Sequence, residues 1–187
     1  MKQSMQVLTS SESNSWYTPL LYVEAARRVM GGIDLDPASI PAVNNWIKAK
    51  KIYTIEDDGL TKTWRGSIFC NPPYGKTNGK SNQEIWTDYA LHQYAEGFIS
   101  EAIILTKTVP GYKWWETLFR GLPVCMCRER IAFWKIVDGE TIVGGKAKMG
   151  TSFWYIGPQK YRFRDVFSKI GRVILPPHTA GYQDFNY

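Results

Sequence analysis

Apolar and polar residues alternate along this chain in two different periods, which predicts helices interleaved with strands. Residues 19–30 follow a helical period, with Thr18 as the expected N-cap and Gly31-Gly32 as the stop. Residues 33–38 alternate apolar with acidic side chains, as a strand does, and residues 40–50 suit a helix. The first part of the chain therefore predicts a strand–turn–helix unit.

The same alternation continues through the middle of the chain. Strands are expected at 51–54, 67–70 and 102–106, and helices at 83–98 and 112–120. The last of these strands is nearly all apolar, which is typical of a buried parallel strand. A polar loop is expected at 75–82.

After Pro123 the pattern changes to mainly β. Strands are expected at 124–134, 151–156 and 172–175, with a turn at Asp138-Gly139, an exposed basic stretch at 144–150 and a helix at 161–170. The sequence thus predicts an α/β fold with a mostly parallel, doubly wound sheet, helices on both faces and an antiparallel C-terminal edge. Ligands of such sheets bind at the carboxyl ends of the strands.

The chain has 187 residues, which suits one domain, and we place it at 16–175. Residues 1–15 are polar and rich in serine, so we expect a disordered lead-in, and Pro176-Pro177 begins a loose tail over 176–187. The composition is globular, and no stretch approaches the roughly 20 apolar residues that span a bilayer. We expect a soluble protein without a membrane partner, as a monomer or a weak dimer.

Three cysteines and two histidines limit the possible chemistry. Cys125 and Cys127 lie two positions apart and no second Cys/His pair completes a zinc site, so we expect neither a disulfide framework nor a metal. His92 and His178 have no carboxylate or cysteine nearby in the sequence. The cysteine usage predicts a reducing, cytoplasmic location.

The formal charge of +6 and the pI of about 9.2 indicate an anionic partner, most simply nucleic acid. The eight Trp and eleven Tyr residues include rings that could stack on bases, although most of them are expected in the core.

The tetrapeptide Asn71-Pro72-Pro73-Tyr74 follows the apolar strand 67–70 and predicts a stiff, extended turn, because a residue before proline avoids the helical region. The side-chain carbonyl of Asn71 and the backbone carbonyl of Pro72 could both accept hydrogen bonds from one amino group. Tyr74 could then stack on the ring that carries this amine. The alternative is an edge strand leaving the sheet through a proline-rich turn.

Four short motifs occur in order: Trp16-Tyr17-Thr18-Pro19, the segment 34–39 (Asp-Leu-Asp-Pro-Ala-Ser), Asp57-Asp58-Gly59-Leu60 and Asn71-Pro72-Pro73-Tyr74. Together they resemble the DNA adenine methyltransferases carried by bacteriophages, the phage-type Dam family. The resemblance is strong from Trp16 to Tyr74 and weaker through residues 130–133 and 151–158. It implies a Rossmann-like methyltransferase fold, S-adenosylmethionine as methyl donor and adenine in duplex DNA as the target.

The resemblance also implies roles for single residues of the donor site. Asp36, followed by Pro37, would meet the donor's ammonium group, and Asp58 would accept from the amine of the donor's adenine. Thr18 and Tyr17 would border the methionine carboxylate. One departure from the pattern is clear, because Ser39-Ile40-Pro41 stands where many methyltransferases have glycines.

On the acceptor side, the resemblance implies that Asn71, Pro72 and Tyr74 receive a flipped adenine. Direct transfer from a sulfonium needs no cysteine nucleophile and no metal, and the Cys70 side chain should alternate away from the turn. No target-recognition domain is visible, so loops must select the sequence. The expected DNA contacts are Lys76, Lys80, Arg128, Arg130, Lys146 and Lys148.

Other functions remain open at this stage. The same turn could hold the exocyclic amine of cytosine or the side-chain amide of a protein glutamine. The chain could also be a DNA-binding relative that has lost donor binding, because of the missing glycines.

Overall fold

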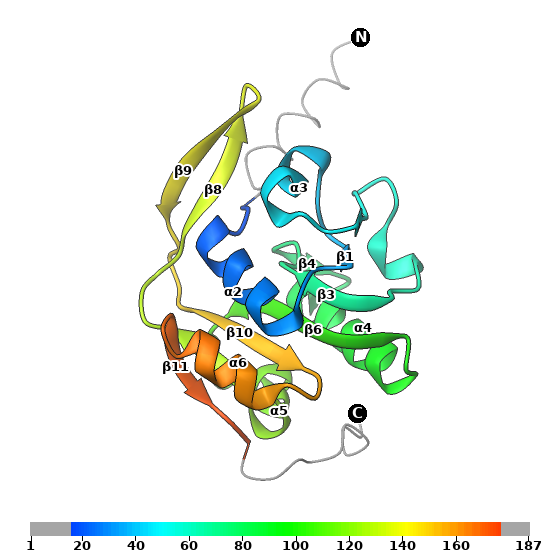
Figure 1. Cartoon of the computed structure of the whole chain (residues 1–187), viewed down its shortest axis with the longest axis vertical. Coiled ribbons are helices and arrows are strands. Elements are labelled where there is room, and N and C mark those ends of the chain that lie inside the picture. The colour runs from blue at the N-terminus through cyan, green and yellow to red at the C-terminus, as the bar shows by residue number, and fades with distance from the viewer. Residues whose placement is uncertain (1–15, 177–187) are drawn as a thin grey trace.

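Seven strands form one central sheet in the computed structural model, which describes residues 16–176 (Figure 1). The strand order is β11-β7-β10-β6-β3-β1-β2. These strands are β1 (Leu35–Asp36), β2 (Lys51–Ile52), β3 (Gly66–Cys70), β6 (Ile99–Lys107), β7 (Val124–Cys127), β10 (Thr151–Ile156) and β11 (Gly171–Ile174). β2, β1, β3 and β6 are parallel, whereas β10 is antiparallel to β6 and β7, and β11 is antiparallel to β7. The predicted fold class, including its antiparallel C-terminal edge, is confirmed.

Helices cover both faces of the sheet (Figure 1). They are α2 (Leu20–Met30), α3 (Pro41–Ile47), α4 (Asn82–Ala95), α5 (Lys113–Gly121) and α6 (Lys160–Phe167). Side chains alternate between two cores: Phe69 packs with α2, α3 and α6, whereas its neighbours Ile68 and Cys70 pack with α4 and α5. Burial on both faces explains the nearly all-apolar run of β6.

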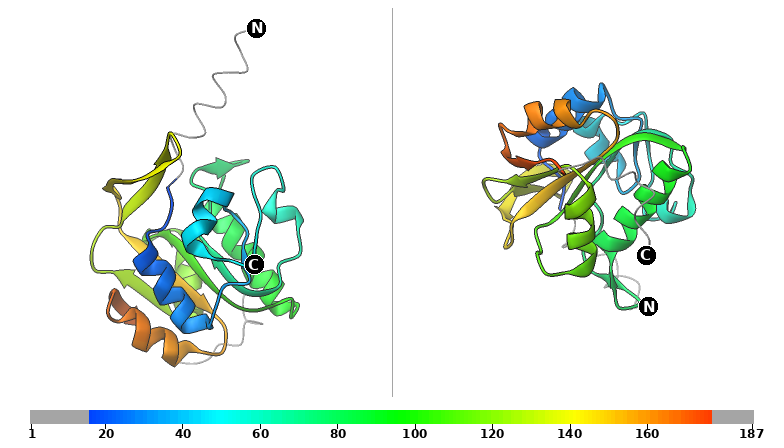
Figure 2. Two further views of the ribbon diagram at one scale, coloured as in Figure 1. Left: turned by 45° about the horizontal axis from the view of Figure 1, so that its top comes forward. Right: turned by 90° about the horizontal axis from the view of Figure 1, so that it is seen from below.

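Two small hairpins lie outside the sheet and project from the same end of the molecule (Figure 2). The first is β4 (Lys76–Thr77) with β5 (Lys80–Ser81), and it occupies the segment expected to be a loop. The second is β8 (Ala132–Val137) with β9 (Glu140–Lys146). Its turn residues Asp138 and Gly139 have φ angles of 52° and 81°, and two left-handed residues are what a two-residue hairpin turn requires.

The carboxyl ends of the parallel strands meet at one edge of the sheet. Asp36, Cys70 and Lys107 end β1, β3 and β6 there. β10 begins at the same edge, because Thr151 pairs with Lys107. This edge is where the predicted fold places its ligands.

The prediction that Thr18 caps the first helix is wrong. The helix begins at Leu20 and its N-cap is Pro19, whose backbone carbonyl accepts from the amides of Tyr22 and Val23. Thr18 instead has a buried hydroxyl without a partner. Threonine is a preferred N-cap residue, but here the residue after it, Pro19, takes the extended N-cap conformation, with φ of −63° and ψ of 153°.

The prediction of one continuous strand at 124–134 is also wrong. Residues 128–131 leave the sheet, and the Arg128 amide donates to the carbonyl of Ile170. β8 then pairs with β9 and makes a bridge from Trp134 to Tyr17. The stretch 144–150 is basic and mostly exposed as expected, but its first part belongs to β9.

Other boundaries differ by a few residues. The helix expected at 40–50 ends at Ile47, because Lys48 takes a left-handed conformation with φ of 53°. The predicted lead-in 1–15 and the tail from 177 onward lie outside the described residues. Within 16–176, no helix has the length and apolar character needed to cross a membrane.

Candidate functional site

Buried polar atoms without hydrogen-bond partners gather at the carboxyl edge of the sheet. Among the described residues there are six such side-chain atoms, and five belong to segments that meet at this edge: Thr18 Oγ1, Ser39 Oγ, Asn71 Oδ1, Gln83 Nε2 and Thr151 Oγ1. The sixth, Trp115 Nε1, is in α5. An unpartnered buried polar atom costs about 1–3 kcal/mol, so a cluster of them at one edge indicates a site for a polar ligand.

The Asn71 side chain is held so that its oxygen remains an open acceptor. Nδ2 donates to the backbone carbonyl of Trp16 over 2.7 Å, whereas the buried Oδ1 has no partner. Pro72 is buried and Pro73 is exposed. The turn therefore presents an oriented amide oxygen at the end of β3.

Tyr74 is half-buried and packed beside this turn. The Lys107 Nζ lies 4.8 Å from its ring centroid, and Phe133 meets the ring edge-on at 6.4 Å between centroids. Burial raises the pKa of the Tyr74 hydroxyl to about 12. The hydroxyl is therefore neutral at physiological pH and Tyr74 offers an aromatic surface, not a base.

Asp36 is a buried carboxyl group with only 4% of its surface exposed. Burial raises its pKa to about 7, against the opposing effect of the Ala38 amide, which donates to Oδ1 over 3.2 Å. The Ser39 hydroxyl also favours the charged form, although its geometry falls short of a hydrogen bond. Asp36 makes no ion pair with any residue in 16–176. A ligand cation would therefore stabilise its charged form.

Asp58 lies on a turn that packs directly against the loop after Asp36. A Cβ atom at Gly59 would lie 2.3 Å from the carbonyl oxygen of Pro37, so only glycine permits this close approach. Asp58 itself is exposed, and its Oδ1 accepts from the Leu60 amide over 3.3 Å. The structure thus brings Asp58, Asp36 and Pro37 to one region.

The two other acidic residues of these motifs have structural partners. Asp34 accepts from the amide and hydroxyl of Ser67 and forms an ion pair with Lys50, which ties β1 to β3. Asp57 accepts from the amide and hydroxyl of Thr54 and closes its own turn. Neither side chain is left for a ligand in this arrangement.

The segment before α2 joins the site through its backbone. Tyr17 and Trp134 exchange two backbone hydrogen bonds of 2.9 Å, which fixes residues 16–18 against β8. The Tyr17 ring packs edge-on against Trp46, at 6.4 Å between centroids. Thr18 Oγ1 is the only one of this segment's side-chain atoms that is buried without a partner.

The six basic residues expected to contact DNA do not form one cluster. Lys76 is exposed, but Lys80 is paired with Asp88 at 2.9 Å and with Glu84 at 3.5 Å. Arg130, Lys146 and Lys148 are exposed around the base of the β8–β9 hairpin, where Ala132 pairs with Lys146. Of the six residues, these three, Lys76 and Arg128 are exposed and form no ion pair within the described residues.

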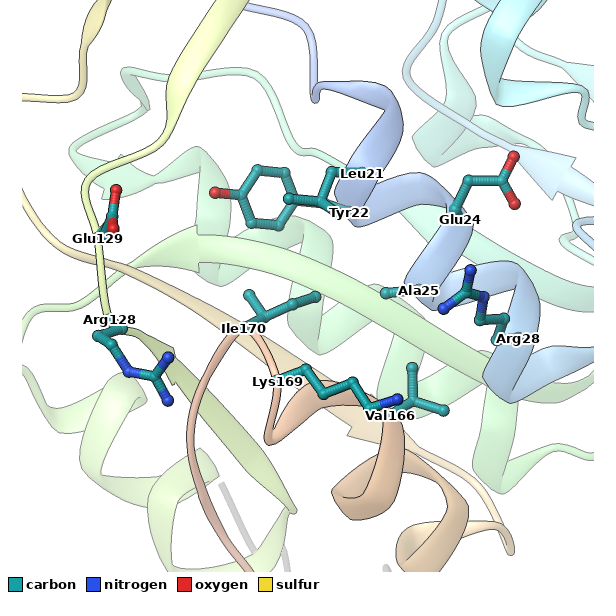
Figure 3. Close-up of a pocket in the computed structure, with 10 residues that line it drawn as sticks. All are labelled: Leu21, Tyr22, Glu24, Ala25, Arg28, Arg128, Glu129, Val166, Lys169 and Ile170. Atoms are coloured by element: carbon teal, nitrogen blue, oxygen red, sulfur yellow. The ribbon is translucent and has the colours of Figure 1, made fainter.

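Arg128 lies elsewhere, in a groove of about 320 Å³ between α2, α6 and the segment after β7 (Figure 3). The groove is lined by Leu21, Tyr22, Glu24, Ala25, Arg28, Arg128, Glu129, Val166, Lys169 and Ile170. None of the proposed catalytic or donor-binding residues lines it, and its charges are mixed. We therefore place the candidate site at the sheet edge and not in this groove.

Sequence reasoning missed three residues of this edge. Gln83 is only 3% exposed; its Oε1 accepts from the Lys107 amide over 3.1 Å, which leaves Nε2 unpartnered. Thr151 has a buried hydroxyl that lies near the Cys127 thiol, although its geometry falls short of a hydrogen bond, and Lys107 lies over the Tyr74 ring. Of the three, only Gln83 could have been suspected from the sequence, because it follows the turn at Asn71 closely. Lys107 and Thr151 reach this edge through the pairing of β6 with β10.

We also looked for a cysteine nucleophile and for a metal-binding group among the described residues. Burial raises the pKa of the Cys70 thiol well above its usual range, and nearby Asp36 adds to this effect, so Cys70 is poorly suited to be a nucleophile. The residues from 16 to 176 contain no group of three or more His, Cys, Asp or Glu side chains arranged to hold a metal ion.

A sequence model of the family described as DNA N-6-adenine-methyltransferase (Dam) matches residues 6–156 of the chain. The matched range contains Trp16, Asp36, Asp58 and the turn at Asn71, and it ends with β10. No curated protein matches the chain.

Proposed function

Because the chain belongs to the DNA N-6-adenine-methyltransferase (Dam) family, we propose that it is an enzyme that methylates the exocyclic N6 amine of adenine in duplex DNA. The observation that carries this proposal is the buried Asn71 Oδ1, which has no partner in the structure and is oriented by the bond from Nδ2 to Trp16. A buried hydrogen-bond acceptor of this kind suits an amino group of the substrate, which donates a hydrogen bond to it.

On the acceptor side, Asn71 Oδ1 and the backbone carbonyl of Pro72 accept hydrogen bonds from the two protons of the adenine amine. These bonds favour a pyramidal nitrogen whose lone pair is free to react. Tyr74 stacks on the base through its ring, and its neutral hydroxyl takes no proton in the reaction. Catalysis in this scheme is positioning and electrostatic stabilisation.

The donor side fits S-adenosylmethionine, whose sulfonium would supply an activated methyl group when bound. Asp36 holds the ammonium group, and the buried, unpaired carboxyl is the observation that supports this fit. Asp58 accepts from the donor's adenine amine at the turn beside Pro37. Thr18 and Tyr17 border the donor's carboxylate, for which the unpartnered Thr18 hydroxyl is a suitable hydrogen-bond donor.

The target adenine must leave the duplex to reach Asn71, because the N6 amine of a stacked and paired base is inaccessible. The chain would therefore flip the nucleotide and hold it against Tyr74. Its net charge of +6 favours binding to the DNA backbone. We place this reaction in the cytoplasm of a bacterial or phage-infected cell.

Labelled methyl transfer from S-adenosylmethionine to unmethylated duplex DNA, followed by hydrolysis to nucleosides, tests the proposal. We expect the label in N6-methyl-2′-deoxyadenosine from the wild-type chain and none from Asn71→Ala. Label in N4-methyl-2′-deoxycytidine would assign the cytosine amine, and label in a protein would assign a glutamine amide. Absence of both transfer and donor binding by calorimetry would identify an inactive DNA-binding relative.

A further inference from the structure

We propose that the β8–β9 hairpin is the part of this chain that binds the DNA duplex beside the target adenine. In this proposal its basic base, residues 130–132 and 146–148 (the hairpin root), contacts phosphates, and the exposed apolar side chains of β9 enter the major groove. The proposal rests on the proposed function, since it takes duplex DNA as the substrate.

The hairpin root is anchored next to the residues that receive the base. Gly150, just after the root, accepts from the Thr108 amide over 2.8 Å at the end of β6. The preceding residue, Lys107, places Nζ 4.8 Å from the centre of the Tyr74 ring. Phe133 of β8 packs against the same ring, at 6.4 Å between centroids. A duplex that presents a base to Tyr74 must therefore lie close to the hairpin root.

Charges are separated along the hairpin in a way that suits a phosphate backbone at its root. Arg130, Lys146 and Lys148 are all exposed at the root, and none of them forms an ion pair within the described chain. The acidic residues Asp138 and Glu140 lie at the opposite end, at and beside the turn. The turn end would repel phosphates, so the root is the end that touches the backbone.

The outer part of the hairpin exposes apolar side chains that no part of the described chain covers. Val143 has 71% of its surface exposed, and Ile142 and Val137 have 44% and 46%. The residue of β8 that pairs with Val143 is packed, since Trp134 contacts Trp46 at 5.2 Å between ring centroids. A two-stranded ribbon fits the major groove, where apolar side chains contact thymine methyl groups.

The hairpin is also connected to the catalytic turn. Tyr17 pairs with Trp134 of β8, and the adjacent residue Trp16 accepts the hydrogen bond from Asn71 Nδ2. Lys135 of β8 lies over the Trp16 ring, with Nζ 4.1 Å from its centroid. The strand that binds the duplex therefore also supports the residue that orients Asn71.

The root is tested with the double variant Lys146→Ala/Lys148→Ala. Its matched control is Arg120→Ala/Arg162→Ala, which removes two exposed charges near the opposite edge of the sheet. Duplex affinity is measured by fluorescence anisotropy at several salt concentrations, with thermal unfolding as a check on folding. Each phosphate contact contributes a log–log slope of about −0.9, so we expect the root variant to lose up to about two such contacts and the control to lose none. A root variant with the slope and affinity of the control would overturn the proposal.

The contact with the major groove of DNA is tested with Ile142→Ser/Val143→Ser. This variant should keep the salt slope of the wild type but lose its preference among adenine-containing sequences in a pooled duplex substrate. An unchanged preference would refute the groove contact. If the wild type is a dimer in sedimentation and this variant a monomer, the exposed apolar side chains are covered by a second copy and not by DNA. If the wild type methylates adenine and the hairpin variants behave like the wild type, only this inference is refuted. If the wild type neither binds nor methylates duplex DNA, the proposed function is refuted as well.

Discussion

The side-chain nitrogen of Asn71 lies 2.7 Å from the backbone carbonyl oxygen of Trp16, a residue 55 positions earlier in the chain. Because Nδ2 is engaged, the amide cannot rotate freely, and Oδ1 remains directed into the site without a partner. A backbone carbonyl accepts hydrogen bonds but cannot donate them, so it fixes which end of the Asn71 amide faces it.

Replacing Asn71 with alanine should abolish methyl transfer while donor affinity stays within a few-fold of the wild type. The loss of one preorganised polar group corresponds to about 2.7–4 kcal/mol, or roughly 10²–10³ in kcat. Single-turnover methylation and donor calorimetry measure the two effects separately. Near-normal turnover in this variant would contradict the role assigned to Asn71.

Tyr74→Phe should be tolerated, whereas Tyr74→Ala should weaken the productive complex by about 1–3 kcal/mol, the usual contribution of a ring stacked on a base. The reason is that the proposed contact uses the ring face, and the hydroxyl has a pKa of about 12 and stays neutral. Steady-state kinetics on duplex DNA checks this difference. Tyr161→Ala is the control, because Tyr161 is an exposed ring on α6 that also lies against basic side chains. Equal damage from Phe and Ala at position 74 would show that the hydroxyl is required.

Asp36 should make both donor binding and stability depend on pH. Its pKa in the folded chain, about 7, lies above its unfolded value of 3.8, so the folded state holds the proton more tightly. Without donor, this contribution to the free energy of unfolding is fully present below the unfolded pKa and is lost as pH rises through about 7. Thermal unfolding of wild type and Asp36→Asn between pH 4 and 8 measures the difference.

Donor affinity should show the opposite dependence on pH. The donor's ammonium group favours ionised Asp36, so wild-type affinity should fall as pH falls below about 7. Asp36→Asn should bind weakly at every pH in this range. A wild-type affinity that does not change with pH would mean that Asp36 does not meet the ammonium group.

Local patterns in the sequence were sufficient for the sheet and for most of the helices. β3 and β6 could be predicted because burial on both faces makes their runs apolar, and the helix at residues 20–30 because its buried positions follow the helical period. Residues 132–134 were predicted as the end of one strand at 124–134, because alternation with a period of two is the same whether a strand pairs with the core sheet or with β9. In the structure β8 pairs with β9 and forms a bridge to Tyr17.

The residues of the candidate site also fall into those that the sequence predicted and those that it did not. The four motifs predicted a site built from Asp36, Asp58 and Asn71, and in the structure Asp36 ends β1 and Asn71 follows β3 at the carboxyl edge. Gln83, Lys107 and Thr151 were missed because their relevance depends on which strand ends meet. Lys80 stays a predicted DNA contact, although in the structure it also pairs with Glu84 and Asp88 of α4.

Gly144 provides the sharpest test of the connection between the hairpin and Asn71. A Cβ atom at this position of β9 would lie 2.7 Å from the Phe133 carbonyl oxygen and 2.9 Å from the Trp16 ring, closer than real Cβ contacts permit. Gly144→Ala should therefore displace Trp16 and weaken its hydrogen bond with Asn71. A bond of this kind contributes about 0.5–1.5 kcal/mol, so we expect kcat to fall about two- to tenfold.

The matched control for this prediction is the next residue of the same strand. A Cβ atom at Gly145 would meet nothing within 4 Å, so Gly145→Ala should leave kcat unchanged. Donor affinity is measured in both variants, because Trp16 adjoins Tyr17 and Thr18, which border the donor's carboxylate in the proposed site. If both alanine variants keep wild-type kcat and the same thermal stability, Trp16 tolerates the displacement and its carbonyl is not what orients Asn71. If the activity that Gly144→Ala loses equals the fraction of protein that is unfolded, the substitution destabilises β9 and does not act through the turn at Asn71.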